Sequence, residues 1–139
     1  MKFSLDSSEG ITIRGYGEGH VVVALPPGVV DAQASGPSEG HRETVTTSVV
    51  LTPDRIIRDG LPETFEQLEA SHFEALMELE PEVVLFGSGA KLRFPAPALL
   101  RRLTERGMGV EVMDTAAACR TYNVLIAEGR RVTAALLMI

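Results

Sequence analysis

Two short segments hold the residue types that could bind a ligand or act on one. The first is Gly87-Ser88-Gly89-Ala90-Lys91, in which glycines would let backbone N–H groups approach an anion closely. The second runs from Met113 to Asn123 and places a carboxylate, a guanidinium, a phenol and an amide on or beside one helix. Together they are compatible with a polar cleft for a small, anionic molecule. The candidate binding residues are Gly87, Ser88, Gly89, Lys91, Asp114, Thr115, Arg120, Thr121, Tyr122 and Asn123.

The glycine-rich segment also has a purely structural interpretation. It lacks the spacing of a Walker phosphate-binding loop. We favour a tight turn after an apolar strand, which would let Phe94 and Pro95 pack. A ligand cradle stays open as the alternative.

The second segment cannot direct all of its side chains into one pocket. On helical spacing Arg120 and Asn123 share one face, whereas Cys119 and Tyr122 share another. Arg120 could form an ion pair with Asp114 instead of binding a ligand. The same polar residues could also lock their helix onto the sheet.

The remaining reactive residue types show no catalytic or metal-binding arrangement. Cys119 lies near a helix N-terminus, which favours a thiolate, but the three alanines before it indicate a small, buried residue. The histidines, His20, His41 and His72, lack the spacing of metal ligands. The segment Gly15-Tyr16-Gly17-Glu18-Gly19 lacks the strand-to-helix context of a dinucleotide fingerprint. We therefore predict no catalytic residue, no metal and no cofactor, and the sequence leans away from an enzyme.

The N-terminal half is predicted to be β-structure. Residues 11–14 and 20–25 are rich in β-branched side chains and flank the glycine-rich residues 15–19, which predicts a hairpin. Residues 31–42 are polar and contain several turn formers, which indicates a mobile surface loop. Residues 44–52 alternate Val, Thr and Leu in the manner of a single strand.

The chain beyond residue 63 is predicted to alternate helices and strands. The capping box Thr64-Phe65-Glu66-Gln67 predicts the start of a helix that ends at Pro81. Apolar strands are predicted at 83–86 and 110–113, joined through a helix that begins near Pro97. A short crossover through a helix makes these two strands parallel.

The last part of the chain brings the two candidate segments to one edge of the sheet. Asp114 is predicted to cap a helix over residues 115–127, and residues 132–139 form a buried final strand. Because the strands at 83–86 and 110–113 are parallel, the turns that follow them lie at the same edge. The glycine-rich turn and the start of the helix should therefore be neighbours.

Length and composition exclude several classes of protein. The 139 residues predict a single domain over residues 1–139, and one cysteine cannot form an internal disulfide. A formal net charge of −6 argues against sequence-independent binding to nucleic acid, which needs a basic surface. No apolar stretch approaches the roughly 20 residues of a membrane span, so we expect a cytoplasmic protein.

The net charge conceals an uneven distribution. Residues 1–90 hold 5 basic and 15 acidic residues, whereas residues 91–139 hold 8 basic and 4 acidic ones. The acidic run from 59 to 90 is interpreted as a solvated helix face, or as a docking surface for a basic partner. The basic C-terminal part favours an acidic partner or ligand.

Four segments of the C-terminal half, residues 84–89, 107–115, 117–125 and 128–132, form an ordered series of motifs. This series resembles a family of small domains of unknown function that includes a mitochondrial complex I assembly factor and an adipogenesis-associated protein. The resemblance implies an α/β fold of three layers with a central mixed sheet and an N-terminal β-hairpin region. It also implies a C-terminal strand-helix-strand-helix-strand unit whose last strand is antiparallel to its neighbours.

The family carries no established reaction, so the resemblance implies no catalytic residues. Relatives often have a tryptophan shortly after the strand at 44–52, where this chain has Arg58-Asp59-Gly60. We therefore predict a non-catalytic protein-interaction or assembly-factor-like protein with a protein partner, and self-association stays open. The alternative is a small-molecule-binding protein or enzyme that uses the cleft between residues 87–91 and 114–123.

Overall fold

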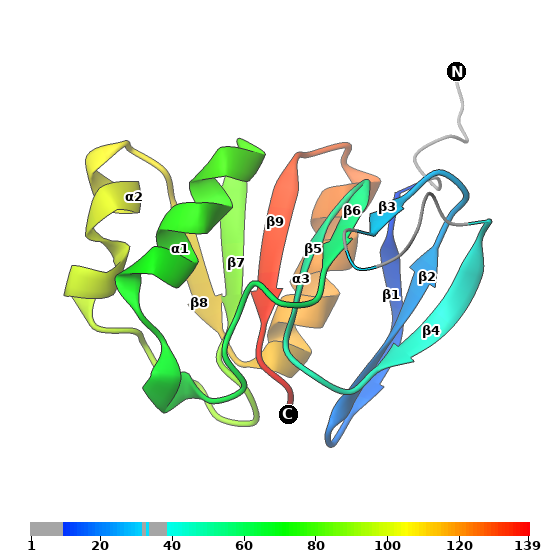
Figure 1. Ribbon diagram of the computed structural model, residues 1–139, viewed down its shortest axis with the longest axis horizontal. Helices are drawn as coiled ribbons and strands as arrows, with labels where there is room; N and C mark the ends of the chain where they lie inside the picture. Colours follow the sequence, from blue (N-terminus) through cyan, green and yellow to red (C-terminus); the bar gives the residue numbers. More distant parts are fainter. Residues whose placement is uncertain (1–9, 32, 34–38) are drawn as a thin grey trace.

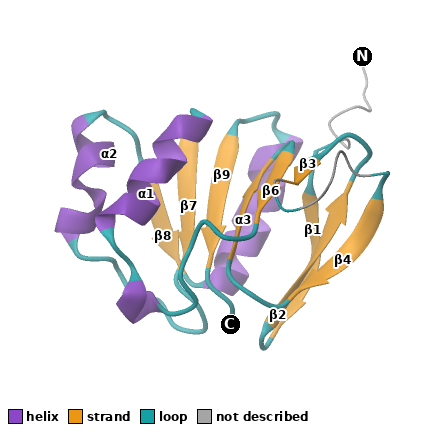
Figure 2. Cartoon of the chain, viewed as in Figure 1, coloured by secondary structure: helices purple, strands orange, loops and turns teal. Residues whose placement is uncertain are grey.

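The chain folds into three layers around a large mixed sheet, as expected (Figure 1, Figure 2). The computed structural model describes residues 10–31, 33 and 39–139. Helices α1 (Ala70–Leu76) and α2 (Arg101–Glu105) lie in front of the large sheet in Figure 1. Helix α3 (Thr115–Ala127) lies behind it, beside a smaller sheet.

Six strands form the large sheet, in the order β3-β6-β5-β9-β7-β8. Their bounds are β3 Val30–Asp31, β6 Arg55–Ile57, β5 Val49–Thr52, β9 Val132–Leu136, β7 Val83–Gly87 and β8 Val110–Met113. The predicted parallel pairing of β7 with β8 is confirmed. The last strand, β9, was expected to be antiparallel to both of its neighbours. It is antiparallel to β5, as expected, but parallel to β7. The reason is that α3 returns the chain behind the sheet, which makes β9 run in the same direction as β8 and β7.

Three strands form the small antiparallel sheet, in the order β1-β2-β4. They are β1 Thr12–Gly17, β2 His20–Leu25 and β4 His41–Val45. The predicted hairpin is confirmed, but its turn is only Glu18-Gly19, with Gly19 at φ +75°. The other glycines of the expected turn belong to β1, which has an irregularity between Ile13 and Gly15.

The prediction of a single strand over residues 44–52 is wrong, because the ends of this segment belong to two strands, β4 and β5. The chain leaves the small sheet after Val45 and enters the large sheet at Val49. Ser48 is buried at this crossing, where its hydroxyl donates to the Leu61 carbonyl at 3.2 Å. All four residues of β5 are buried because layers cover both of its faces, so the alternating pattern ends with β4.

The loop predicted over residues 31–42 lies partly outside the described residues, which leave out 32 and 34–38. Its two ends belong to strands. Asp31 closes β3, and His41 begins β4.

The helix predicted to start at the capping box begins later. Thr64 and Gln67 do form the box, but it caps a short 3-10 helix, η2 (Phe65–Gln67). Helix α1 starts at Ala70, where the His72 side chain accepts the Glu69 N–H at 2.9 Å. A second 3-10 turn, η3 (Met77–Leu79), precedes Pro81.

The segment that begins at Pro97 is also a 3-10 helix first, η4 (Pro97–Leu100), and becomes α-helical at Arg101. Helix α3 has the predicted bounds, and Asp114 is its N-cap.

Two apolar clusters cover the two faces of the large sheet. Leu85, Leu51 and Tyr122 belong to the cluster that joins the large sheet to α3 and the small sheet. Phe73 and Phe86 belong to the other cluster, under α1 and α2, with their ring centroids 5.5 Å apart. Helix α3 is therefore enclosed between the two sheets, which limits how many of its side chains can face a ligand.

Candidate functional site

Thr115 joins the start of α3 to the turn after β7. Its hydroxyl donates to the Leu137 carbonyl at 2.6 Å and accepts the Gly89 N–H at 2.8 Å. A Cβ added at Gly87 would lie 2.8 Å from the Thr115 Oγ1, so glycine is needed for this close approach. The two predicted segments are indeed neighbours, but buried hydrogen bonds join them.

Ser88 uses its polar groups inside the same turn. Its N–H donates to the Met113 carbonyl at 2.9 Å, and its hydroxyl donates to the Lys91 carbonyl at 2.6 Å. The hydroxyl also accepts the Arg93 N–H at 3.0 Å. The N–H groups of Ser88 and Gly89 are thus already bonded and cannot also hold an anion, which supports the structural interpretation of this turn.

Asp114 and Arg120 do not pair with each other. The Asp114 carboxylate caps α3 by accepting the Ala117 N–H at 2.9 Å, as predicted. Arg120 is exposed and donates to the Tyr16 hydroxyl on β1 at 2.6 Å. Arg120 therefore contacts the small sheet, away from the start of the helix.

Tyr122 and Asn123 fasten α3 to both sheets: Asn123 bonds β1, and Tyr122 bonds β5 and the residue before β1. The buried Tyr122 hydroxyl lies 2.9 Å from the Ile11 carbonyl and 3.2 Å from the Thr52 carbonyl, and burial raises its pKa. Asn123 accepts the Ile13 N–H at 2.9 Å and donates to the Ile13 carbonyl at 2.7 Å. Because β1 is an edge strand, the Asn123 amide takes the place of a neighbouring strand at Ile13.

We expect Asn123→Ala to lower the free energy of unfolding by about 1–2 kcal/mol, because both polar groups of Ile13 lose their partner. Chemical denaturation followed by circular dichroism measures this change. Val124→Ala is the matched control on the same helix, since Val124 is exposed, and it should stay within about 0.5 kcal/mol of the parent. Equal losses in the two variants would contradict the assigned role of Asn123.

The predicted residues therefore do not line one cleft. Ser88, Gly89 and Lys91 line a cavity of about 520 Å³ together with Arg93 and others, and residues 114–123 are not among its lining. Arg93 is engaged there, because it pairs with Glu66 at 2.8 Å. Lys91 is the exposed cation of the predicted set at this cavity. Ligand binding by the ten candidate residues stays a prediction.

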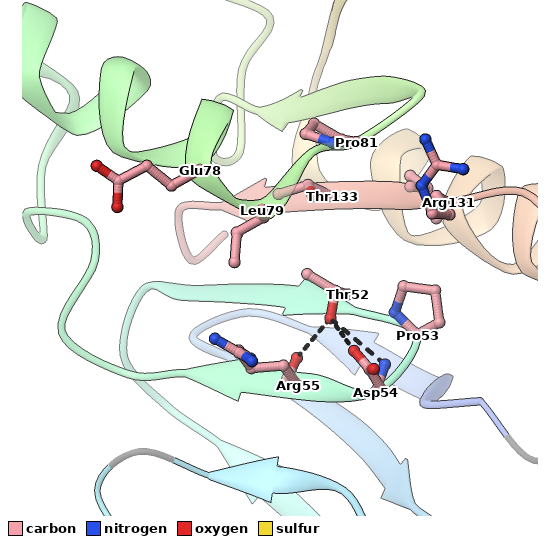
Figure 3. A pocket seen from close by; sticks show the side chains of 10 residues that line it. Thr52, Pro53, Asp54, Arg55, Glu78, Leu79, Pro81, Arg131 and Thr133 are labelled. Carbon is pink, nitrogen blue, oxygen red and sulfur yellow. Dashed lines mark hydrogen bonds between the residues drawn. The ribbon is translucent and has the colours of Figure 1, made fainter.

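A second cavity, of about 350 Å³, opens where β5 and β9 separate beyond the pair Leu51–Ala134. Figure 3 shows Thr52 on one side of it and Thr133 on the other. The charged residues around it carry both signs, namely Asp54, Arg55, Glu78 and Arg131. Because two acidic and two basic residues lie around this cavity, its charge favours neither an anionic nor a cationic ligand. The sequence could not have shown this cavity, because Thr52 and Thr133 are far apart in the chain.

Arg58, the residue that follows β6, joins β3 to β4 through an ion cluster that the sequence did not reveal. Its guanidinium lies 2.9 Å from the Asp31 carboxylate and 2.8 Å from the Glu43 carboxylate. Burial disfavours the charged form of Asp31, but bonds from Arg58 and the Gln33 N–H outweigh it and lower the pKa. Hydrogen bonds from Arg58 also lower the pKa of Glu43. The cluster ties β3 and β6 of the large sheet to β4 of the small sheet.

Cys119 is buried, and His72 and His41 have partners in the fold. Burial raises the pKa of Cys119 to about 12, so its thiol is neutral at physiological pH. His72 caps α1, and His41 lies 3.4 Å from Glu43. Within residues 10–31, 33 and 39–139, no group of three or more His, Cys, Asp or Glu side chains could hold a metal ion.

Phe94 is the most exposed large apolar side chain of the described residues, although the turn favoured from the sequence would let it pack. Phe94 is 68 % exposed and Leu92 is 53 % exposed, whereas Pro95 is buried. Phe94 lines a groove of about 630 Å³ that runs beside β8, the last strand of the large sheet. In sequence this segment has neither helix nor strand periodicity, so nothing distinguished an exposed Phe94 from a buried one.

Fold and site together define a small α/β domain in which most of the motif residues hold helix α3 between two sheets. The chain belongs to the family described as protein of unknown function (DUF498/DUF598), whose model matches residues 13–137. The resemblance seen in the sequence is thereby confirmed.

Two curated relatives illustrate the range of names in this group. The chain is 38 % identical over 89 residues to NADH dehydrogenase (ubiquinone) 1 alpha subcomplex assembly factor 3 of Bos taurus, covering 63 % of this chain and 48 % of that protein. It is 31 % identical over 68 residues to the 13 kDa major membrane protein of Francisella tularensis, covering 49 % of this chain and 55 % of that protein. The chain thus spans about half the length of these relatives.

Solved structures match over nearly the whole chain. A crystal structure of a Bordetella parapertussis protein has a TM-score of 0.73 at 32 % identity and covers 92 % of this chain and 95 % of that one. A solution structure of a Bordetella pertussis protein, described as a Mth938-like domain, has a TM-score of 0.64 at 26 % identity, with 99 % and 92 % covered. No helix in the described part of the chain has the length and hydropathy to cross a membrane.

Proposed function

We propose that this chain is a non-catalytic protein-binding domain that supports the assembly of a protein complex. One observation carries the proposal: most of the motif side chains are bonded within the fold, while Phe94 is exposed in a groove beside the edge strand β8 and Leu92, two residues earlier in the chain, is exposed as well. Exposed apolar groups in one place mark protein-binding surfaces, whereas a catalytic site needs polar groups free to act. The name of the assembly-factor relative supports this role. A cytoplasmic location stays a prediction.

Photocrosslinking in living cells tests the proposal. The crosslinking residue p-benzoylphenylalanine replaces Phe94 in one variant and Val124 in the other. Val124 is the matched control because it is 56 % exposed and apolar but lies on α3. We expect position 94 to give discrete protein adducts that position 124 does not give.

The alternative function is binding of a small anionic molecule at the cavity lined by Ser88, Gly89 and Lys91. A ligand at 100 times its dissociation constant would stabilise the chain by about 2.7 kcal/mol. The proposal fails if position 94 gives no adduct. The alternative is supported instead if a screened anion raises the melting temperature of the parent but not of Lys91→Ala.

A further inference from the structure

We propose that the free edge of β8 takes up an extended segment of the partner as an added strand, with a basic residue opposite Glu111 and apolar residues on either side of it. This inference rests on the proposed function, since it names the surface and the chemistry of the partner.

The backbone of β8 has donors and acceptors available on its outer side. The Gly109 carbonyl accepts the Val84 N–H, and the Met113 carbonyl accepts the Ser88 N–H, so these groups face β7. Because backbone groups alternate along a strand, those of Val110 and Val112 point away from the sheet. Within the described residues β8 pairs with β7 alone. An incoming strand would find two N–H groups and two carbonyls in register.

The side of β8 that faces the helices is apolar. Val110 and Val112 are half-buried there and pack against the cluster under α1 and α2. The groove of about 630 Å³ continues this surface through Leu100 and Phe94. The side chains of an added strand that point toward this layer should therefore be apolar.

The opposite side of β8 carries a charge. Glu111 alternates with the two valines and is exposed, so it points to the other face of the sheet. Oppositely charged residues directly across two strands stabilise their pairing, and like charges destabilise it. A lysine or arginine is therefore favoured opposite Glu111.

The same charge argues against a second copy of this chain as the occupant. The symmetric antiparallel register that pairs Val110 with Val112 of a second copy joins the outward backbone groups of both strands, and it places Glu111 directly opposite its own counterpart. The edge of β1 offers a contrast, because the Asn123 side chain already bonds the N–H and the carbonyl of Ile13 there. At the outer edge of β8 no described side chain bonds the backbone in this way. A basic segment of a different protein therefore suits this edge better than a second copy of the chain.

Nuclear magnetic resonance with a synthetic peptide, acetyl-STVKVTS-amide, tests the inference on the full chain. We expect bound peptide to slow amide exchange at Val110 and Val112, whereas the Glu111 amide, which faces β7, changes little. Replacing the peptide lysine by glutamate should weaken binding at least about fivefold. N-methylation of the peptide valines should abolish binding, because it removes the donors of the added strand.

Three outcomes would overturn the inference: peptide contacts that map away from β8, equal binding of the lysine and glutamate peptides, and a dimer protected at Val110 and Val112 without peptide. On the protein side, Val112→Pro removes an outward N–H and should abolish peptide binding, while Val112→Thr keeps this N–H and should bind. Amide spectra of both variants verify that they fold. If the peptide tests fail but crosslinks from position 94 persist, only this inference falls; if those crosslinks are absent, the proposed function falls.

Discussion

Thr115→Val should lower the free energy of unfolding by about 2–4 kcal/mol. Valine has nearly the same shape as threonine but cannot bond the Gly89 N–H or the Leu137 carbonyl. Thr115 is fully buried, so water cannot replace these bonds. Urea denaturation followed by circular dichroism gives the change directly.

Two further variants isolate the role of the hydroxyl. Thr115→Ser keeps both hydrogen bonds and loses one methyl group, so it should cost about 1 kcal/mol. Thr121→Val on the same helix should stay within about 0.5 kcal/mol, since the Thr121 hydroxyl bonds to none of the described residues. If the serine variant lost as much stability as the valine variant, packing rather than hydrogen bonding would join α3 to the turn.

Arg58→Met should destabilise the fold by about 2 kcal/mol, because two carboxylates would face each other without their cation. Arg58→Lys should recover only part of this loss, since an ammonium cannot hold two carboxylates in the way a guanidinium does. Arg55→Met is the matched control: Arg55 begins β6, three residues before Arg58, and is exposed, so we expect a change below about 0.5 kcal/mol. Similar effects at positions 55 and 58 would contradict the role of the cluster.

The Arg58 cluster also predicts how stability depends on pH. The folded pKa values of Asp31 and Glu43 lie below their usual values. A lowered carboxyl pKa contributes stability above the unfolded value, about pH 4, and this contribution is lost as the pH falls through the folded value. The stability difference between the parent and Arg58→Met should therefore narrow between about pH 5 and pH 3. Denaturation curves across this range measure it, and a constant difference would contradict the assignment.

Elements with strong local signals could be predicted from the sequence. The carboxylate of Asp114, the alanines after it and Gly129 set the bounds of α3 without help from the rest of the fold. The parallel pairing of β7 with β8 followed because a short helical crossover allows little else. Local capping was less informative at Thr64, where the same motif starts a 3-10 turn and the α-helix begins at Ala70.

What depends on distant partners could not be predicted. The extended chain is interrupted between β4 and β5 because Val45 pairs in the small sheet and Val49 pairs in the large sheet. No local sequence pattern indicates that these two residues belong to different sheets. The Asn123 amide bonds a residue 110 positions away, so its type suggested a ligand site as readily as a structural bond. Arg58 likewise meets carboxylates 27 and 15 positions earlier in the chain.

The place of β9 has a consequence for the order of folding. Along the chain, β9 comes after all the other described strands. In the large sheet, however, it lies between β5 and β7. Until β9 has been synthesised, the pair β5–β6 and the pair β7–β8 cannot join into one sheet. Strands β5 and β7 then each have one edge without a partner. Unpaired strand edges are prone to aggregate. A nascent chain therefore most needs protection by chaperones before residues 132–136 have paired with β5 and β7.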